Sequence, residues 1–228
     1  MSTFIPDYRI TRRLEALVLR VAKHWAIVDA KLPAEFPVVV LDGMELAEFL
    51  ALPAAQETVY ITLNPLDMDL KLALSSLKKA KELIRNRMQW FRQYMRGFYM
   101  NSPFLAGLDV LPDLGDGPDE FLPPIVSTMF LWERIALEPP PVANKPPVMA
   151  DGYTAAHFAA ELAALDGAYG AVRRVKLSQT LARSELLVIN TRAAAAIQAY
   201  GHAARSRLMP LDPLLASIPR LWPVKQGE

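Results

Sequence analysis

The sequence contains no cysteine. This absence excludes disulfides, thiolate metal ligands and cysteine nucleophiles, and it is compatible with a cytoplasmic protein. Histidine is also scarce, with 3 residues in a chain of 228. The sequence has no Walker loop, no dinucleotide-binding glycine motif and no Gly-x-Ser-x-Gly motif. It therefore predicts no catalytic residue, no metal site and no cofactor.

The chain lacks an excess of charge of either sign and lacks long apolar runs. Lys and Arg number 25 and Asp and Glu number 24, so the net charge of +1 draws the chain neither to nucleic acid nor to a membrane surface. The longest charge-free runs, such as 121–132, are shorter than the roughly 20 residues that span a bilayer. The first residues lack the basic and apolar regions of a secretory signal. We expect a cytoplasmic protein without a membrane span.

Residues 154–208 contain no proline and predict one long helix. Phe158, Leu162, Leu165, Tyr169 and Val172 recur at helical spacing on one face. An unbroken helix of this length would extend roughly 80 Å at 1.5 Å per residue, although Asp166-Gly167 is also a turn signal. Residues 193–204 carry no formal charge apart from His202, and we expect another helix to cover them.

Residues 7–31 predict a first helix, because Ile10, Leu14, Leu17, Val21 and Trp25 form one stripe. Residues 36–41 and 58–63 are rich in β-branched side chains, which favours either a small two-stranded ribbon or extended segments. Asn64-Pro65 then predicts the start of a second long helix that ends near residue 99. The stripe predicted to be buried on this helix comprises Leu77, Ala80, Ile84, Met88, Phe91, Met95 and Phe98.

Glycine and proline divide the remaining sequence. Residues 109–120 predict an acidic loop, and residues 121–138 predict a short helix confined to the part after Pro123 and Pro124. Prolines within 139–150 predict a stiff linker. The expected domains are an N-terminal helix (1–32), a first helical unit (33–138), this linker (139–150) and a second helical unit (151–228).

Several landmarks occur twice. Asp42-Gly43 and Phe49 match Asp151-Gly152 and Phe158 at one offset of 109 positions. Each match is followed by a long helix with a tyrosine near its end, Tyr94 or Tyr200, and by a tail punctuated by prolines. Chance matching in a sequence rich in alanine and leucine is the alternative. The sequence thus predicts an all-α, elongated bundle of two repeated helical-hairpin units, packed like a coiled coil, with at most a small β-ribbon within 36–63.

The second of these units resembles a loose group of uncharacterised bacterial helical-hairpin proteins. The resemblance rests on the long Ala- and Arg-rich helix and on the ending from Pro213 to Leu221, and it covers the last third of the chain. It implies a helical hairpin and no known activity.

One face of the second long helix carries a basic stripe, which comprises Lys78, Lys81, Arg85, Arg92 and Arg96. Together with nearby aromatic residues it is compatible with nucleic-acid binding. It is also compatible with a solvated helix face whose aromatic residues belong to the core, and with a partner surface for the acidic loop. That loop lacks the ligand spacing of a calcium loop. The His157 and Glu161 pair has no second pair to complete a metal site.

These patterns favour a structural role. We expect self-association into a homo-oligomer or filament, or scaffolding of a protein partner, without enzymatic activity. The predicted interface residues are Trp90, Tyr94, Tyr200 and Trp222, together with Asp113, Asp116 and Asp119 of the acidic loop. The alternative function is nucleic-acid binding through the basic stripe.

Overall fold

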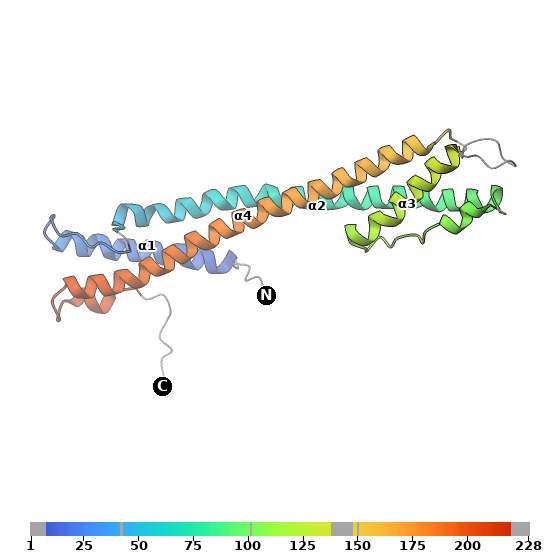
Figure 1. The fold of residues 1–228 in the computed structure, drawn as a ribbon. Helices are drawn as coiled ribbons and strands as arrows, with labels where there is room; N and C mark the ends of the chain where they lie inside the picture. The colour runs from blue at the N-terminus through green and yellow to red at the C-terminus, as the bar shows by residue number, and fades with distance from the viewer. Residues whose placement is uncertain (1–7, 42, 101, 138–147, 150, 220–228) are drawn as a thin grey trace. The chain divides into compact units, whose positions relative to one another are not determined.

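The structure is a computed structural model that describes residues 8–41, 43–100, 102–137, 148–149 and 151–219. The predicted all-α class is confirmed, since the described residues form helices joined by loops and turns (Figure 1). The elements in order are α1 (Tyr8–Lys31), α2 (Leu46–Phe98), the 3-10 helix η1 (Pro103–Gly107), α3 (Pro118–Leu137), α4 (Ala155–Arg207) and the 3-10 helix η2 (Pro213–Ser217).

The β-ribbon considered for residues 36–63 is wrong. Among the described residues the only strand-like pairing is an isolated antiparallel bridge between Val40 and Met44. Residues 58–63 lie inside α2, where Val59 and Leu63 are one helical turn apart and pack against Ala182 and Leu186 of α4. Burial of this helical face outweighs the β preference of the individual residues, which depends strongly on context.

Several prolines that were expected to precede or begin a helix lie inside one instead. Helix α2 starts at Leu46 and continues through Pro53 and Pro65, so the predicted start at Asn64-Pro65 is wrong. Helix α3 starts at Pro118 and includes Pro123 and Pro124, which were expected to precede it. Each interior proline removes one backbone hydrogen bond.

The long helix predicted for 154–208 is confirmed as α4, which is continuous over 53 residues. Gly167, Gly170 and Gly201 do not interrupt it, although each costs about 1 kcal/mol relative to alanine. The charge-free segment near its end is covered as expected. Ala193, Ala196, Ile197, Tyr200 and Ala204 are all buried against α1 and the start of α2.

The chain divides into two compact units that do not coincide with the sequence ranges expected above. Unit 1 comprises Met1–Leu66 and Ser178–Glu228, and unit 2 comprises Asp67–Leu177. Helices α2 and α4 each contribute one part to unit 1 and one part to unit 2. Most of the predicted linker, residues 139–147 and 150, lies outside the described residues.

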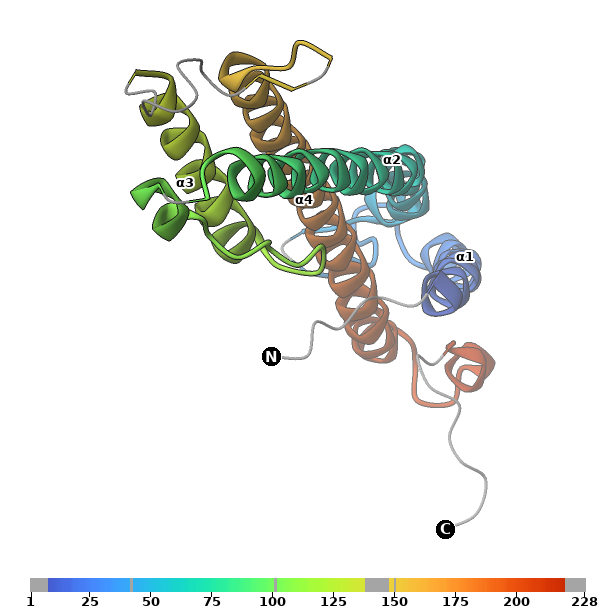
Figure 2. The ribbon, with the colours of Figure 1, turned by 90° about the vertical axis from the view of Figure 1, so that its right-hand side faces the viewer.

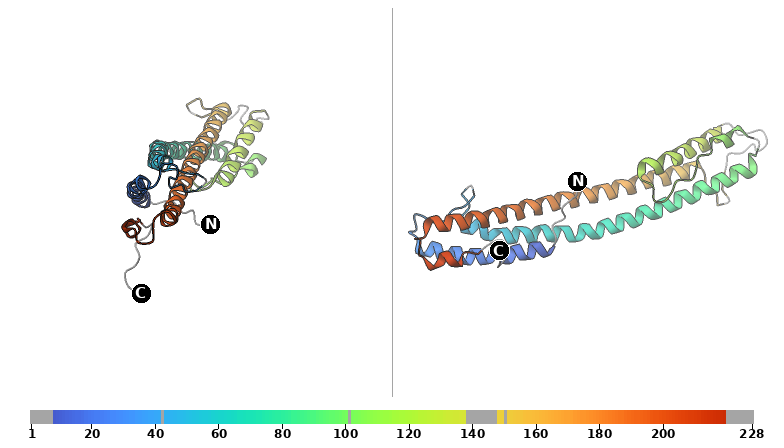
Figure 3. Two further views of the ribbon diagram at one scale, coloured as in Figure 1. Left: turned by 90° about the vertical axis from the view of Figure 1, so that its left-hand side faces the viewer. Right: turned by 90° about the horizontal axis from the view of Figure 1, so that it is seen from below.

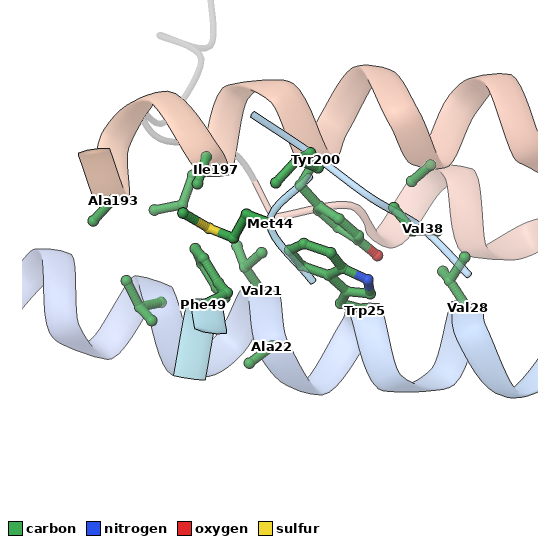
Figure 4. Packing of buried hydrophobic residues seen from close by; sticks show 14 of the residues in the cluster. Val21, Ala22, Trp25, Val28, Val38, Met44, Phe49, Ala193, Ile197 and Tyr200 are labelled. Carbon is green, nitrogen blue, oxygen red and sulfur yellow. The ribbon is translucent and has the colours of Figure 1, made fainter. Parts of the chain in front are cut away.

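The core of unit 1 is built from α1, the start of α2 and the end of α4, which lie side by side (Figure 3). Trp25 of α1 is fully buried at its centre. Its ring stacks on Tyr200 with centroids 4.9 Å apart and lies 5.5 Å from Phe49 (Figure 4). Residues Val38 and Met44, from the turn between α1 and α2, complete this core.

The core of unit 2 is built from α3, the end of α2 and the start of α4 (Figure 2). Trp132 of α3 occupies its centre, stacked on Phe91 at 4.5 Å and lying 5.7 Å from Phe158. The predicted buried stripe of α2 is confirmed at Ile84, Met88, Phe91 and Met95. Phe98 was assigned to this stripe wrongly, since it is 64% exposed and Tyr99 is buried instead.

The two cores use corresponding sequence positions. In α2 and α4, and at the residue directly after each of them, positions separated by 109 are buried in both units: Phe49 and Phe158, Ile84 and Ala193, Met88 and Ile197, Phe91 and Tyr200, Met95 and Ala204, Tyr99 and Leu208. Between α1 and α3 the separation is 107: Val18 and Ile125, Val21 and Thr128, Trp25 and Trp132, Val28 and Ile135. Tyr200 therefore corresponds to Phe91, whereas the sequence landmarks had matched it with Tyr94.

The backbone turns correspond as well. The amide of Val40 donates to the carbonyl of Met44, and the amide of Met149 donates to the carbonyl of Tyr153, at 2.9 Å in each case. Each turn contains a glycine with positive φ, Gly43 at 93° and Gly152 at 78°, a conformation that glycine adopts without steric cost. The two units thus share turns as well as buried positions.

Candidate interaction surface

The basic stripe of α2 holds the acidic loop of the same unit. Lys81 Nζ donates to the carbonyl oxygens of Leu114 at 2.8 Å and Asp116 at 2.6 Å. Arg85 Nε donates to the carbonyl of Pro112 at 2.9 Å. The Lys81 ammonium also lies 4.5 Å from the centroid of the Phe121 ring. Two of the five stripe cations therefore stabilise the fold, as one of the three sequence interpretations proposed.

Lys81 is buried, and its environment acts on its charge in two directions. Desolvation lowers the pKa of Lys81, whereas the nearby carboxylates of Asp116 and Asp113 oppose that shift. The same two aspartates shape the loop, because the amide of Asp113 donates to Asp116 Oδ2 and the amide of Gly115 donates to Asp113 Oδ1. The carboxylates of Asp113 and Asp116 therefore accept hydrogen bonds from backbone amides within the loop. Asp119, also predicted as an interface residue, lies in the first turn of α3 and is exposed.

The other stripe cations are more accessible. Lys78 is exposed and lies 3.9 Å from Glu82, one helical turn away. Arg96 is exposed and Arg92 is half-buried. Because phosphate binding depends on how many cations can reach the backbone of a nucleic acid, engagement of Lys81 and Arg85 leaves a smaller basic surface than the sequence implies.

Three aromatic side chains form a row along the outer face of α2 in unit 2. The Trp90 ring stacks on Tyr94 with centroids 5.2 Å apart, and the Tyr94 ring lies 4.6 Å from Phe98. Trp90 and Tyr94 are half-buried, and Phe98 is largely exposed. Since aromatic side chains with this partial exposure are enriched at protein interfaces, we name Trp90, Tyr94 and Phe98 the aromatic row.

A hollow of about 470 Å³ adjoins the aromatic row. It is lined by Leu83, Asn86, Arg87, Trp90, Met149 and Asp151. Leu83 is 46% exposed at its edge. Its walls thus combine apolar side chains with one cation and one carboxylate.

Arg87 is fixed in place by a polar cluster beneath this hollow. Its guanidinium lies 3.3 Å from Asp151 and 3.8 Å from Glu161, and 4.3 Å from the centroid of the Tyr153 ring. The Tyr153 hydroxyl donates to Glu161 Oε2 at 2.8 Å. Burial, followed by this hydrogen bond, raises the pKa of Tyr153 well above its ordinary value. Sequence reasoning missed the cluster, because no local spacing connects Arg87 on α2 with Glu161 on α4.

Apart from Asp42, which corresponds to Asp151, the corresponding positions of unit 1 carry other residues. At the separation of 109, Asn86, Arg87, Trp90 and Tyr94 correspond to Ala195, Ala196, Ala199 and Ala203, and Phe98 corresponds to Arg207. Glu161 corresponds to Leu52, which is buried. The aromatic row and the polar cluster are therefore particular to unit 2, whereas the core positions are common to both units.

The remaining predicted interface residues lie elsewhere. Tyr200 is fully buried in unit 1, where its hydroxyl bonds to His24 Nδ1 at 2.6 Å, so it is a core residue and not a surface residue. His24 Nε2 lies 3.0 Å from the carbonyl oxygen of Leu214 and 3.1 Å from Ser217 Oγ. Burial raises the pKa of Tyr200. Trp222 lies outside the described residues.

The histidine and glutamate pair on α4 is engaged in protein contacts. The amide of Thr154 donates to His157 Nδ1 at 3.1 Å, and Glu161 accepts from Tyr153. Within the described ranges no three or more metal-ligating side chains gather in a group. Within the same ranges, no helix has both the length and the apolar character required to cross a membrane.

Comparison of the chain with protein-family models, with curated proteins and with solved structures finds no match.

Proposed function

We propose that this chain is a duplicated helical protein with a structural role, and that it self-associates into a homo-oligomer or filament through the aromatic row of unit 2. The observation that carries this proposal is the partly exposed aromatic row, which has no counterpart at the corresponding positions of unit 1. The duplication is supported by the two sets of buried positions at separations of 109 and 107.

A second copy of the chain is the occupant that the charges favour. A net charge of +1 produces almost no repulsion between copies, and proteins near zero net charge associate readily. The row offers Trp and Tyr, which dominate the binding energy of many interfaces. Leu83, at the edge of the adjoining hollow, extends the apolar surface.

Nucleic-acid binding is the second candidate function, and the contacts of α2 favour it less. Lys81 and Arg85 donate to loop carbonyls and are already engaged within the unit. The cations left for phosphate contact are Lys78, Arg92 and Arg96. Their affinity for nucleic acid would fall steeply with added salt, whereas an apolar interface would be nearly insensitive to it.

The deciding experiment measures molar mass by light scattering over a range of protein and salt concentrations. We expect assemblies that grow with protein concentration and persist in high salt. The Phe98→Arg variant carries at position 98 the residue type that unit 1 has at the corresponding position, Arg207. We expect this variant to associate about 10- to 100-fold more weakly, the range typical of an interface hot spot. Phe130→Arg is the matched control, because Phe130 is a similarly exposed phenylalanine of α3, 59% against 64%.

Two results would contradict this proposal. One is a monomer of 25.4 kDa at every concentration. The other is equal association of the Phe98→Arg and Phe130→Arg variants. Binding to single-stranded DNA that disappears with salt and with replacement of Lys78, Arg92 and Arg96 would instead support the second candidate.

A further inference from the structure

Each unit contains the end of a long helix whose start belongs to the other unit. Unit 1 contains the end of α4, and unit 2 contains the end of α2. The first repeat contributes α1 and the start of α2 to unit 1, but it contributes the end of α2 to unit 2. The second repeat contributes α3 and the start of α4 to unit 2 and the end of α4 to unit 1. The central aromatic contacts follow this division, since Trp25 stacks on Tyr200 and Trp132 stacks on Phe91.

A repeat cannot close a unit by itself while its long helix remains continuous. Helix α2 passes without interruption from Leu66 to Asp67, where the division between the units falls. To pack its own end against its own start, the first repeat would have to break the helix and fold it back. Within the intact fold, each repeat therefore needs a second repeat to cover its buried faces.

We infer that the fold is an exchanged dimer of two repeats fused into one chain, and that a second copy of the chain fits the same faces by exchanging repeats. The inference rests on the duplication proposed above and is independent of the aromatic row. In the exchanged assembly the first repeat of one chain forms unit 1 with the second repeat of another chain. The contacts are those of the single chain, so no new interface has to be created.

Protein concentration selects between the two forms. Residues 99–117 join α2 of the first repeat to α3 of the second, and in the unfolded chain a connection of this length gives the attached repeat an effective concentration in the millimolar range. Chains that fold at micromolar concentration will therefore close internally. Chains that fold near millimolar concentration will exchange repeats in a substantial fraction of molecules.

The absence of native cysteine permits a specific test. Glu48 of α2 and Arg192 of α4 face each other in unit 1, with Glu48 Oε2 and Arg192 Nη2 4.0 Å apart and both side chains more than half exposed. One full-length variant carries Glu48→Cys and a second carries Arg192→Cys. The two are unfolded, mixed, refolded together and treated with a short bismaleimide. A link between position 48 of one chain and position 192 of the other can form only if the two chains share one copy of unit 1.

We expect a product of twice the 25.4 kDa chain mass, identified by mass spectrometry of the linked peptides, whose yield rises with the concentration during refolding. Mixing the same variants after each has folded separately at micromolar concentration should give less than a tenth of that yield. A chain that carries both substitutions and is refolded at micromolar concentration reports the internal link and shows that the two introduced thiols are within reach.

Efficient internal linkage with no linkage between co-refolded chains at any concentration would overturn the inference. The Phe98→Arg variant separates this result from the self-association proposal, because it should weaken the aromatic row while leaving the exchange product unchanged. Concentration-dependent mass without a link between positions 48 and 192 of different chains would thus support the aromatic interface and contradict exchange.

Discussion

Replacement of Tyr200 by phenylalanine tests the correspondence between the two units with a single hydroxyl. In unit 1 this hydroxyl lies 2.6 Å from His24 Nδ1, and both residues are buried. In unit 2 the corresponding residues are Phe91 and Leu131, which form no such hydrogen bond. Tyr200→Phe keeps the ring that stacks on Trp25 at 4.9 Å but leaves His24 Nδ1 without its partner.

The expected cost follows from desolvation of one unpaired group. Loss of a partner for a buried polar atom reduces the free energy of unfolding by about 1–3 kcal/mol. In a chain of this length each kcal/mol lowers the melting temperature by about 2–4 °C. His24→Leu should destabilise the protein by at least as much, because it leaves the Tyr200 hydroxyl unpaired and also removes the contacts of His24 Nε2 with Leu214 and Ser217.

The double variant His24→Leu with Tyr200→Phe should cost less than the sum of the single variants by about 1–3 kcal/mol, because neither unpaired group remains. Addition of Ser217→Gly should recover further stability. Gly107 is the last residue of η1, as Ser217 is of η2. A Cβ added at Gly107 would lie only 3.3 Å from Leu131, so a leucine at position 24 needs the same space beside residue 217. Urea unfolding followed by circular dichroism measures all four variants. Single-variant costs that add to within about 0.5 kcal/mol would refute the reasoning.

Two further predictions concern unit 2. Lys81→Met should lower the free energy of unfolding by about 1–3 kcal/mol, because the carbonyls of Leu114 and Asp116 lose their charged donor. Lys78→Met should change the free energy of unfolding by less than about 0.5 kcal/mol, since Lys78 is exposed. Equal urea midpoints for both variants would contradict a stabilising role for the hydrogen bonds of Lys81 to the loop. Because the folded-state pKa of Tyr153 is raised, the stability that its protonated hydroxyl contributes is fully present below pH 10 and is lost as the pH rises further. Tyr153→Phe should therefore reduce the decline in the free energy of unfolding above pH 10, measured by urea unfolding. An unchanged decline would show that Tyr153 does not cause it.

Helical periodicity alone predicted much of the fold. The stripe on α1 that includes Val21 and Trp25, and the stripe on α2 that includes Ile84 and Phe91, are buried as their spacing predicts. A stripe of apolar residues at intervals of three and four identifies a helix whatever its partner is. The failures lie where local signals compete with tertiary burial, as at residues 58–63.

Periodicity does not identify which helices pack together. The stripe of Phe91 gives no sign that its partner is Trp132, nor does that of Tyr200 point to Trp25. The proposed repeat left a sequence signal at Gly43 and Gly152, because a positive φ restricts the residue type. It was obscured in the cores, where Ile84 corresponds to Ala193 and both choices satisfy burial. For the same reason the sequence could not show that each long helix serves both units.

The candidate site was predictable only in part. Trp90 and Tyr94 were identified because large aromatic residues widen the apolar stripe of α2. Phe98 was placed in the core, since a helical stripe does not specify where the covering partner ends; Tyr99 fills that place instead. The contacts of Arg87 with Asp151 and Glu161 join distant parts of the chain and leave no mark on local sequence spacing.

The proposed duplication offers a physical reason why the two units differ outside their cores. Each core must bury corresponding faces, which restricts both members of pairs such as Trp25 and Trp132 to large apolar side chains. Phe98 of α2 is under no such restriction, because its side chain is 64% exposed. Trp90 corresponds to Ala199, and both residues are partly buried and pack against the core of their own unit. Packing against the core accounts for part of Trp90 and Tyr94, whereas Phe98, which is 64% exposed, is the residue of the row that folding explains least.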